Sequence, residues 1–167
     1  MKGAKSIFVD RDGVLNRKPV TSRYVRNWSE FQWMPGAIEA VALLKKAGYQ
    51  VILITNQAGI GLGQMTEQDL FKIFDLMQLD LGKQGGQLDG MYFCPHRPDA
   101  GCNCRKPKPG LLLKAKEELG LDLAKTTFIG DEDKDLLAGQ QAGCPTLLVS
   151  PGCSLLDLVR TRILVGV

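Results

Sequence analysis

The sequence predicts a single α/β domain, built on a mainly parallel sheet of the doubly wound, Rossmann-like kind. Five short apolar segments alternate along the chain with amphipathic stretches of about 10 to 15 residues, the pattern of repeated βαβ units. The chain has 167 residues, of which 44% are hydrophobic, so it is long enough to bury one core without disulfides. No internal repeat or low-complexity linker divides it. Residues 1–167 are therefore expected to form one domain.

The expected strands are short, apolar and rich in β-branched residues, which makes them typical of strands buried on both faces. They cover residues 7–9, 49–55, 88–93, 127–130 and 146–149. The expected helices cover residues 37–47, 67–81, 110–119 and 136–142, and the tail 155–167 is expected to begin as a helix and then fray. Thr66 is the predicted N-cap of the second helix, Ser29 is a possible cap in the polar stretch 17–30, and Gly120 is the predicted stop of the third helix.

Composition excludes several classes of function. The net charge is only +3 and no dense basic run is present, so charge gives no indication of nucleic-acid binding. No stretch approaches about 18 consecutive apolar residues, and the first apolar run ends too early, at Asp10, to form a signal peptide. We therefore expect a cytoplasmic protein with no membrane partner. A monomer is also expected, because no exposed apolar helix is evident.

Polar side chains follow three of the predicted strands. Asp10 and Asp12 come after the first strand, Thr55 and Asn56 end the second, and Asp131 follows the fourth. Because parallel strands end at the same edge of a sheet, these side chains should converge there. A D-x-D-G sequence on its own is equally typical of an acidic turn. The other strand ends are what favour a site.

A pair of cations, Arg105 and Lys106, lies in a proline-rich segment between the third strand and its helix. Two carboxylates spaced i, i+2, such as Asp10 and Asp12, can have different roles: one holds a divalent metal while the other reacts or transfers a proton. Carboxylates with a metal, hydroxyl and amide donors, and fixed cations together suit a phosphoryl group, whose charge needs several donors in the transition state.

A cysteine-rich loop precedes these cations. It contains the only histidine of the chain and has the pattern C-x-H-x5-C-x-C, formed by Cys94, His96, Cys102 and Cys104. Four such ligands within eleven residues predict a closed, structural Zn²⁺ site. The alternative is a mobile loop with free thiols. Cys144 and Cys153 have no partner at ligand spacing and are expected to be buried or incidental.

Four motifs in order resemble those of phosphatases of the haloacid dehalogenase superfamily, over residues 7 to about 150. They are Asp10-Arg11-Asp12-Gly13, Thr55, Lys106, and Gly130-Asp131-Glu132-Asp133-Lys134-Asp135. The resemblance implies a Rossmann-like fold, and the segment between the first strand and its helix is too short to hold a large cap domain. The site should therefore be open, with short loops at 18–24 and 57–63 selecting the substrate.

By this resemblance, Asp10 is the nucleophile that forms an aspartyl-phosphate, and Asp12 protonates the leaving group and then activates water. Thr55 and Lys106 would hold the phosphoryl oxygens. Asp131, the Asp10 carboxylate and the backbone carbonyl of Asp12 would bind Mg²⁺, which favours oxygen ligands. Asp135 is expected to orient a neighbour or cap the next helix.

Within the superfamily, D-R-D-G, T-N-Q-x-G-I, C-P-H and C-R-K-P resemble one branch. It contains D-glycero-D-manno-heptose 1,7-bisphosphate phosphatases and histidinol-phosphate phosphatases, so a small phosphorylated sugar or related metabolite is implied as substrate. The expected substrate contacts are Arg11, Asn56, Gln57, Arg105 and Glu132. Glu132 stands where the branch commonly has Lys or Arg. Its carboxylate should repel a second phosphate unless Lys134, Lys18 or Arg23 compensates.

Three other functions remain as alternatives. The glycines of segment 59–63 suggest dinucleotide binding, but their spacing is G-x-G-x-G and Gln64 stands where a third-position glycine is needed. The T-N-Q-x-G-I loop also resembles polynucleotide 3′-phosphatases, which lack this zinc loop, and no aromatic-plus-basic groove is present. A non-catalytic module that binds zinc and Mg²⁺ is the last alternative. The presence of all five residues expected at a catalytic centre argues against it: Asp10, Asp12, Thr55, Lys106 and Asp131.

Overall fold

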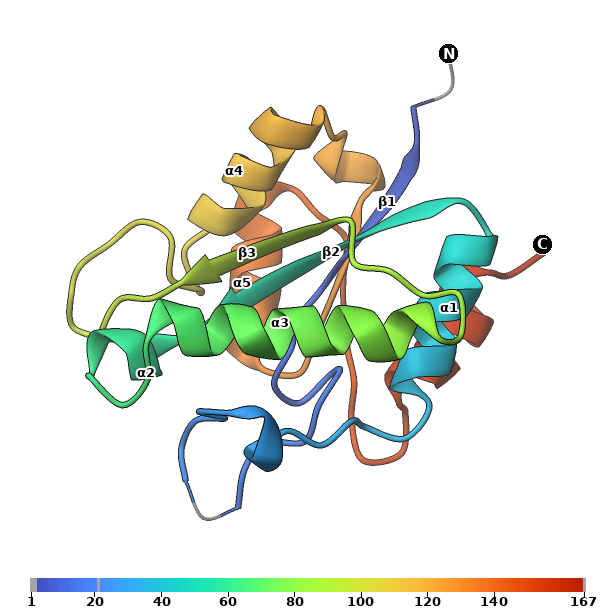
Figure 1. Cartoon of the computed structure of the whole chain (residues 1–167). Helices are drawn as coiled ribbons and strands as arrows, with labels where there is room; N and C mark the ends of the chain where they lie inside the picture. Colours follow the sequence, from blue (N-terminus) through green and yellow to red (C-terminus); the bar gives the residue numbers. More distant parts are fainter. Residues whose placement is uncertain (1–2, 21, 167) are drawn as a thin grey trace.

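The computed structural model describes residues 3–20 and 22–166, and its centre is a five-stranded sheet in the order β3-β2-β1-β4-β5 (Figure 1). Every neighbouring pair of strands is parallel, which confirms the predicted α/β class. The strands are β1 Lys5–Val9, β2 Tyr49–Asn56, β3 Gly90–Cys94, β4 Thr127–Gly130 and β5 Thr146–Leu148. The central position of β1 brings the residues that follow it to the middle of the carboxyl edge.

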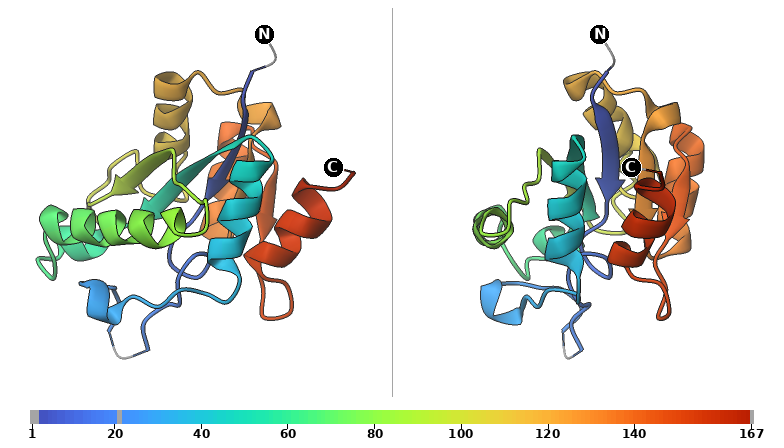
Figure 2. Two further views of the ribbon diagram at one scale, coloured as in Figure 1. Left: turned by 45° about the vertical axis from the view of Figure 1, so that its right-hand side comes forward. Right: turned by 90° about the vertical axis from the view of Figure 1, so that its right-hand side faces the viewer.

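Helices cover both faces of the sheet (Figure 2). The main helices are α1 Ala37–Lys46, α3 Glu67–Gly82, α4 Gly110–Leu119, α5 Asp133–Ala142 and α6 Leu155–Leu158, which continues as a π-helical turn to Ile163. Helices α1, α3 and α6 contribute to one apolar cluster, and α4 and α5 to a second cluster against the opposite face. Since Ile7 belongs to the first cluster and Phe8 to the second, with both fully buried, alternate residues of β1 fill opposite cores.

The local signals at helix ends have the predicted effect. The hydroxyl of Thr66 accepts a hydrogen bond from the backbone N–H of Asp69, and the Asp69 carboxylate accepts one from the N–H of Thr66. This capping box fixes the start of α3. Gly120 ends α4 with φ 65°, a conformation that suits glycine.

Some element boundaries differ from the sequence-based expectation. Helix α5 begins three residues earlier than predicted, because the Asp135 carboxylate accepts hydrogen bonds from the backbone N–H groups of Asp131 and Glu132. Ser29 is not a cap, since it lies within a 3-10 turn, Trp28–Glu30. That turn, a second one at Leu123–Lys125 and the short helix α2 Ala58–Gly61 were not predicted. The expected tail extends to Val167, which lies outside the described residues.

Residues 10–36, between β1 and α1, form the segment in which a cap domain could have been inserted. Apart from residue 21, they fold as a loop with the single 3-10 turn, so no large cap covers the sheet edge (Figure 1). Trp28 stacks on Phe31, Trp33 meets Phe31 edge to face, and all three pack against the first apolar cluster. Among the described residues, no helix is both long and apolar enough to cross a membrane.

Candidate active site

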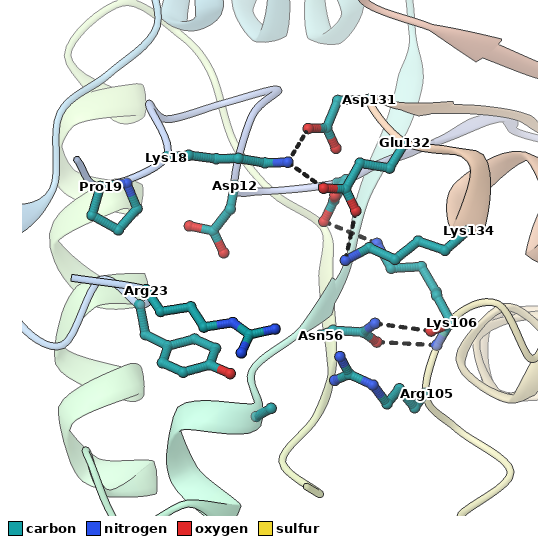
Figure 3. A pocket seen from close by; sticks show the side chains of 13 residues that line it. Asp12, Lys18, Pro19, Arg23, Asn56, Arg105, Lys106, Asp131, Glu132 and Lys134 are labelled. Atoms are coloured by element: carbon teal, nitrogen blue, oxygen red, sulfur yellow. Dashed lines mark hydrogen bonds and ion pairs between the residues drawn. The ribbon is translucent and has the colours of Figure 1, made fainter. Parts of the chain in front are cut away.

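A cavity of about 340 Å³ opens at the carboxyl edge of the sheet (Figure 3). Its walls come from the ends of β1, β2 and β4, from the loop after β1, and from the segment before α4. The lining residues are Asp10, Asp12, Lys18, Pro19, Arg23, Tyr24, Asn56, Ala58, Arg105, Lys106, Asp131, Glu132 and Lys134. The sheet topology therefore brings together most of the side chains that the sequence placed at strand ends.

A buried ammonium group lies between two buried carboxylates at the base of this cavity. Lys106 Nζ is 3.0 Å from Asp10 Oδ1 and 2.7 Å from Asp135 Oδ1, and it also donates to the carbonyl oxygen of Ile54 at 3.1 Å. Burial raises the pKa of Asp10; Lys106 opposes this effect, whereas Asp135 and Asp12 reinforce it, so that the pKa reaches about 7. Burial lowers the pKa of Lys106, but the two carboxylates outweigh it and the net shift is upward.

Asp12 is held from both of its oxygens by neutral and charged donors. Arg11 Nη2 and Asn16 Nδ2 donate to Oδ1 at 2.9 and 3.0 Å, and Gln57 Nε2 donates to Oδ2 at 3.0 Å. Burial alone would raise the pKa of Asp12, but the Arg11 guanidinium and the three hydrogen bonds together hold it below its ordinary value. Asp12 is thus an ionised carboxylate in a fixed orientation.

The side chains of Arg11 and Gln57, two of the predicted substrate contacts, are directed to Asp12 in this geometry. Neither side chain lines the cavity, and their exposed fractions are 0% and 1%. The Arg11 carbonyl accepts hydrogen bonds from the three backbone N–H groups of residues 14–16, so the chain curls around Arg11 and turns its side chain inward. Both residues act on Asp12. Asn16 was not singled out from the sequence, although its place four residues after Asp12 was the available signal.

Thr55 and Asn56 end β2 and differ in what their side chains reach. Thr55 is 1% exposed, and its hydroxyl accepts a hydrogen bond from Gln57 Nε2 at 2.9 Å. The amide of Asn56 forms two 3.1 Å hydrogen bonds with the backbone of Lys106, one as donor and one as acceptor. Asn56 lines the cavity and also fastens the Arg105–Lys106 segment to the sheet edge (Figure 3).

Three carboxylates at the cavity base are arranged so that they could hold a cation. One oxygen from each of Asp10, Asp131 and Asp135 lies within 4.8 Å of the others. Asp131 Oδ1 is buried and has no hydrogen-bond partner among the described residues, whereas both oxygens of Asp135 are engaged by Lys106 and by backbone N–H groups. Oxygen-only donors with an unsatisfied carboxylate oxygen fit a hard divalent cation. Asp135 orients its neighbours and caps α5, as expected.

Glu132 bridges two lysines on the rim of the cavity. One carboxylate oxygen pairs with Lys18 and the other pairs with Lys134 at 2.8 Å, while Lys18 also lies 2.8 Å from Asp131 Oδ2. The hydrogen bonds from Lys134 and then Lys18 lower the pKa of Glu132 to about 2. Two of the three cations that the sequence offered as compensation therefore neutralise this carboxylate. The pairing of Lys18 with Asp131 was not foreseen.

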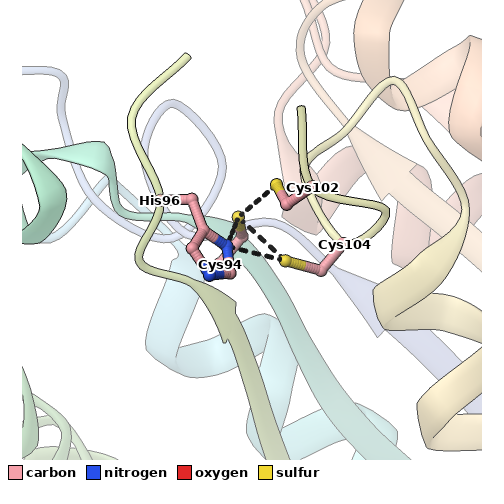
Figure 4. Close-up of side chains that lie close together, drawn as sticks. All are labelled: Cys94, His96, Cys102 and Cys104. Carbon is pink, nitrogen blue, oxygen red and sulfur yellow. Dashed lines mark hydrogen bonds between the residues drawn. The ribbon is translucent and has the colours of Figure 1, made fainter. Parts of the chain in front are cut away.

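The cysteine-rich loop brings its four predicted ligands together beside this site (Figure 4). Cys94 Sγ lies 3.3 Å from His96 Nδ1, 3.6 Å from Cys102 Sγ and 3.1 Å from Cys104 Sγ, and His96 Nδ1 is 3.2 Å from Cys104 Sγ. A tetrahedral Zn²⁺ with ordinary bond lengths separates its ligand atoms by about 3.6 to 3.8 Å. The sulfurs are much too far apart for disulfides, so the arrangement fits a structural metal site.

Comparisons with known proteins agree with this geometry. Residues 103–161 match a family model described as HAD-hydrolase-like. The chain is 40% identical over 159 residues to the D-glycero-beta-D-manno-heptose-1,7-bisphosphate 7-phosphatase of Photorhabdus laumondii, covering 90% of this chain and 83% of the relative. It is 41% identical over 145 residues to the D-glycero-alpha-D-manno-heptose-1,7-bisphosphate 7-phosphatase of Campylobacter jejuni, covering 87% and 81%.

Solved structures give the same result. The structure of the D,D-heptose 1,7-bisphosphate phosphatase from B. bronchiseptica, complexed with magnesium and phosphate, superposes with a TM-score of 0.89. Its sequence identity is 34%, and the match covers 95% of this chain and 98% of that one. The corresponding phosphatase from Burkholderia thailandensis is 26% identical with a TM-score of 0.67, covering 93% and 96%. The similarity thus extends over nearly the whole chain.

Proposed function

Since the chain belongs to the D-glycero-D-manno-heptose-1,7-bisphosphate 7-phosphatase family of the haloacid dehalogenase superfamily, we propose that it is a Mg²⁺-dependent phosphatase that releases the 7-phosphate of this sugar bisphosphate. The observation that carries the proposal is that one cavity has the buried Asp10–Lys106 ion pair at its bottom and several cations around its rim. A dianionic group at the base and a second anionic group at the rim would both meet positive charge.

In the proposed reaction, a carboxylate oxygen of Asp10 bonds to phosphorus while the ester P–O bond breaks, and Asp12 gives its proton to the leaving sugar oxygen. Asp12 then takes a proton from water, which attacks the aspartyl-phosphate, releases inorganic phosphate and restores Asp10. Asp12 is held ionised in the free site, so the proton that it donates is first taken up from solvent, as the approaching phosphoryl dianion raises the proton affinity of Asp12. The proton that Asp12 later takes from water returns to solvent when phosphate leaves. Thr55 and Lys106 are proposed to hold the phosphoryl oxygens.

Two metal ions belong to the proposal. Mg²⁺ would be held by Asp131, the Asp10 carboxylate and the carbonyl oxygen of Asp12, and it would neutralise charge on the transferring phosphoryl group. Its support is Asp131 Oδ1, which is buried and has no hydrogen-bond partner among residues 3–20 and 22–166, and the magnesium in the B. bronchiseptica relative. Zn²⁺ would be held by the four ligands of the cysteine-rich loop and would stabilise the fold without reacting.

The charge on the rim supports a bisphosphate over histidinol phosphate, which carries an amine. Four cations at the rim line the cavity, namely Lys18, Arg23, Arg105 and Lys134, and the carboxylate of Glu132 is already shared by the two lysines. A cationic substrate would meet mainly like charge at this rim, whereas a second phosphate would find Arg23 and Arg105. We further propose that the single domain works as a cytoplasmic monomer, with neither nucleic acid nor membrane as a partner.

The test compares kcat/KM for both anomers of heptose 1,7-bisphosphate, for histidinol phosphate and for a 3′-phosphorylated oligonucleotide, with Mg²⁺ present. One heptose bisphosphate anomer should exceed the other substrates by at least about 100-fold. Both anomers are needed because the relatives act on either one. Equal or greater kcat/KM for histidinol phosphate would overturn the substrate assignment, and no turnover of any phosphate ester would favour a binding module.

The nucleophile is tested separately by Asp10→Asn. An amide cannot form the aspartyl-phosphate, so phosphate release should fall to background. Asp133→Asn is the matched control, because Asp133 is an exposed carboxylate at the start of α5 that does not line the cavity. Substantial Mg²⁺-dependent release by the Asp10 variant would disprove this role.

A further inference from the structure

The rim of the cavity contains a carboxylate that holds two cations together. The two oxygens of Glu132 are divided between Lys18 and Lys134, so that one acidic side chain spans a lysine from the loop after β1 and a lysine from α5 (Figure 3). All three line the cavity in which the proposed substrate would bind. The carboxylate therefore occupies donors that a bound anion could use.

These ion pairs are easy to exchange. The exposed fractions of the side chains are 48% for Lys18, 40% for Glu132 and 35% for Lys134, so water screens each pair and weakens it. A phosphate carries up to two negative charges and three acceptor oxygens, and can thus replace a carboxylate as the partner of two ammonium groups. The buried Asp10–Lys106 pair differs, because it is almost completely shielded from water.

The neighbouring arginines show where a second anion would already be attracted. Neither Arg23 nor Arg105 forms an ion pair with a carboxylate within residues 3–20 and 22–166, and Arg105 Nη1 is a buried donor that finds no partner in that part of the chain. The rim thus offers two arginines outright, whereas Lys134 is engaged by Glu132, and Lys18 is engaged by both Glu132 and Asp131. An anion that binds Lys18 and Lys134 at the rim must therefore break the ion pairs that these lysines form with Glu132.

We propose that Glu132 is a specificity-determining residue that competes with the second phosphoryl group of the substrate for Lys18 and Lys134. Binding of a bisphosphate exchanges the carboxylate for a phosphate at these lysines, whereas a monophosphate, which reaches only Asp10 and Lys106, leaves the Glu132 pairs intact. This inference rests on the proposed function. Glu132 therefore weakens the binding of every anion at the rim, and it lowers the preference for a bisphosphate over a monophosphate that does not reach the rim.

The test is the ratio of kcat/KM for heptose 1,7-bisphosphate to that for p-nitrophenyl phosphate, a monophosphate, measured for the wild-type protein and Glu132→Gln. Removing the competing charge should raise this ratio by about fivefold to twentyfold, mainly through a lower KM for the bisphosphate. Lys134→Met should change the ratio in the opposite direction, because it removes a donor that the second phosphate gains. A merely structural Glu132 would affect both substrates equally.

Asp133→Asn is the matched control for charge. It removes one carboxylate from the adjacent position of the same helix without touching Lys18 or Lys134, so the ratio should stay at its wild-type value. An unchanged or lower ratio for Glu132→Gln would overturn the inference. If the wild-type protein prefers histidinol phosphate, the proposed function itself fails; if it prefers the bisphosphate but Glu132→Gln leaves the ratio unchanged, only the role of Glu132 fails.

Discussion

Replacing Cys102 by serine should show how far the cysteine-rich loop supports the active site. The Sγ atoms of Cys94 and Cys102 are 3.6 Å apart, and a metal joining them closes a loop of nine residues, counted from 94 to 102. The chain-entropy relation for cross-links assigns about 2.6 kcal/mol to a closed loop of this length. Loss of the metal should therefore lower the free energy of unfolding by about 2 to 3 kcal/mol.

Activity should fall as well, because the loop leads directly into the segment of Arg105 and Lys106 that lines the cavity. Arg105 and Lys106 follow Cys104, and Lys108 Nζ donates a hydrogen bond to the carbonyl oxygen of Cys102. Lys106 keeps its own attachment through Asn56 and its burial, so the loss should be moderate. We expect kcat/KM for the bisphosphate to drop by about tenfold, mainly through KM, since Arg105 is less firmly held than Lys106.

The assay combines three measurements on the same preparation: bound zinc by atomic emission, unfolding in urea, and kcat/KM. Cys153→Ser is the matched control, because Cys153 is a partly buried thiol that lies outside the four-ligand cluster. It should retain its zinc, its unfolding midpoint and its activity. Full activity with unchanged unfolding in Cys102→Ser would refute the argument, and so would an equal effect of both substitutions.

Three further substitutions test other parts of the site. Arg11→Met should reduce kcat, measured in steady state, by about 10-fold to 100-fold, because it removes the cation that holds Asp12 ionised and oriented. Melting should change little, because the same substitution removes a buried cation whose Nε and Nη1 find no hydrogen-bond partner among the described residues. Gly130→Ala should lower the free energy of unfolding by about 1 to 3 kcal/mol in urea, and lower activity, since its Cβ would overlap the Asp135 side chain. The pKa of Glu132 is lowered to about 2, below its ordinary value of 4.5, so its ion pairs stabilise the fold above about pH 4.5 and this contribution is lost as pH falls toward 2. Water screens these pairs, so they contribute less than about 1 kcal/mol to the free energy of unfolding. In urea titrations with EDTA at several pH values, Glu132→Gln should lose this much less stability than the wild-type protein as the pH falls.

The parts of the fold and site that could be predicted depend on residues close together in sequence. The run at 7–9 is too short and too apolar for anything but a buried strand, and Thr66 and Gly120 carry their capping function in their own side chain or backbone. The four Cys and His side chains of the cysteine-rich loop lie within eleven residues, so their spacing alone indicated a cluster. Parallel pairing then placed the strand ends at one edge.

The parts that could not be predicted depend on where tertiary packing directs a side chain. Arg11 lies between two aspartates, and its sequence position fits a substrate contact as well as a buried support for Asp12. The turn in which the N–H groups of residues 14–16 bind the Arg11 carbonyl buries the side chain, and this turn was not evident from the sequence. Lys18 and Glu132 are 114 residues apart, and their pairing needs the loop after β1 to lie beside the start of α5. The sequence identified Lys18 as one of three cations that could pair with Glu132, but it did not show which of them does.

The base of the cavity contains more carboxylates than cations, and this imbalance explains why its parts depend on one another. Asp10, Asp131 and Asp135 converge, while Lys106 is the buried cation between two of them. Asp135 also holds the N–H groups that begin α5, so the position of Lys106 is tied to the strand end that carries Asp131. Lys106 and, at the rim, Lys18 together offset only two of these three carboxylates, so a dianionic phosphoryl group would still meet surplus negative charge at the base of the cavity. A divalent cation held by Asp10 and Asp131 would supply the missing positive charge. The geometry therefore favours a site that combines Lys106 with a divalent cation.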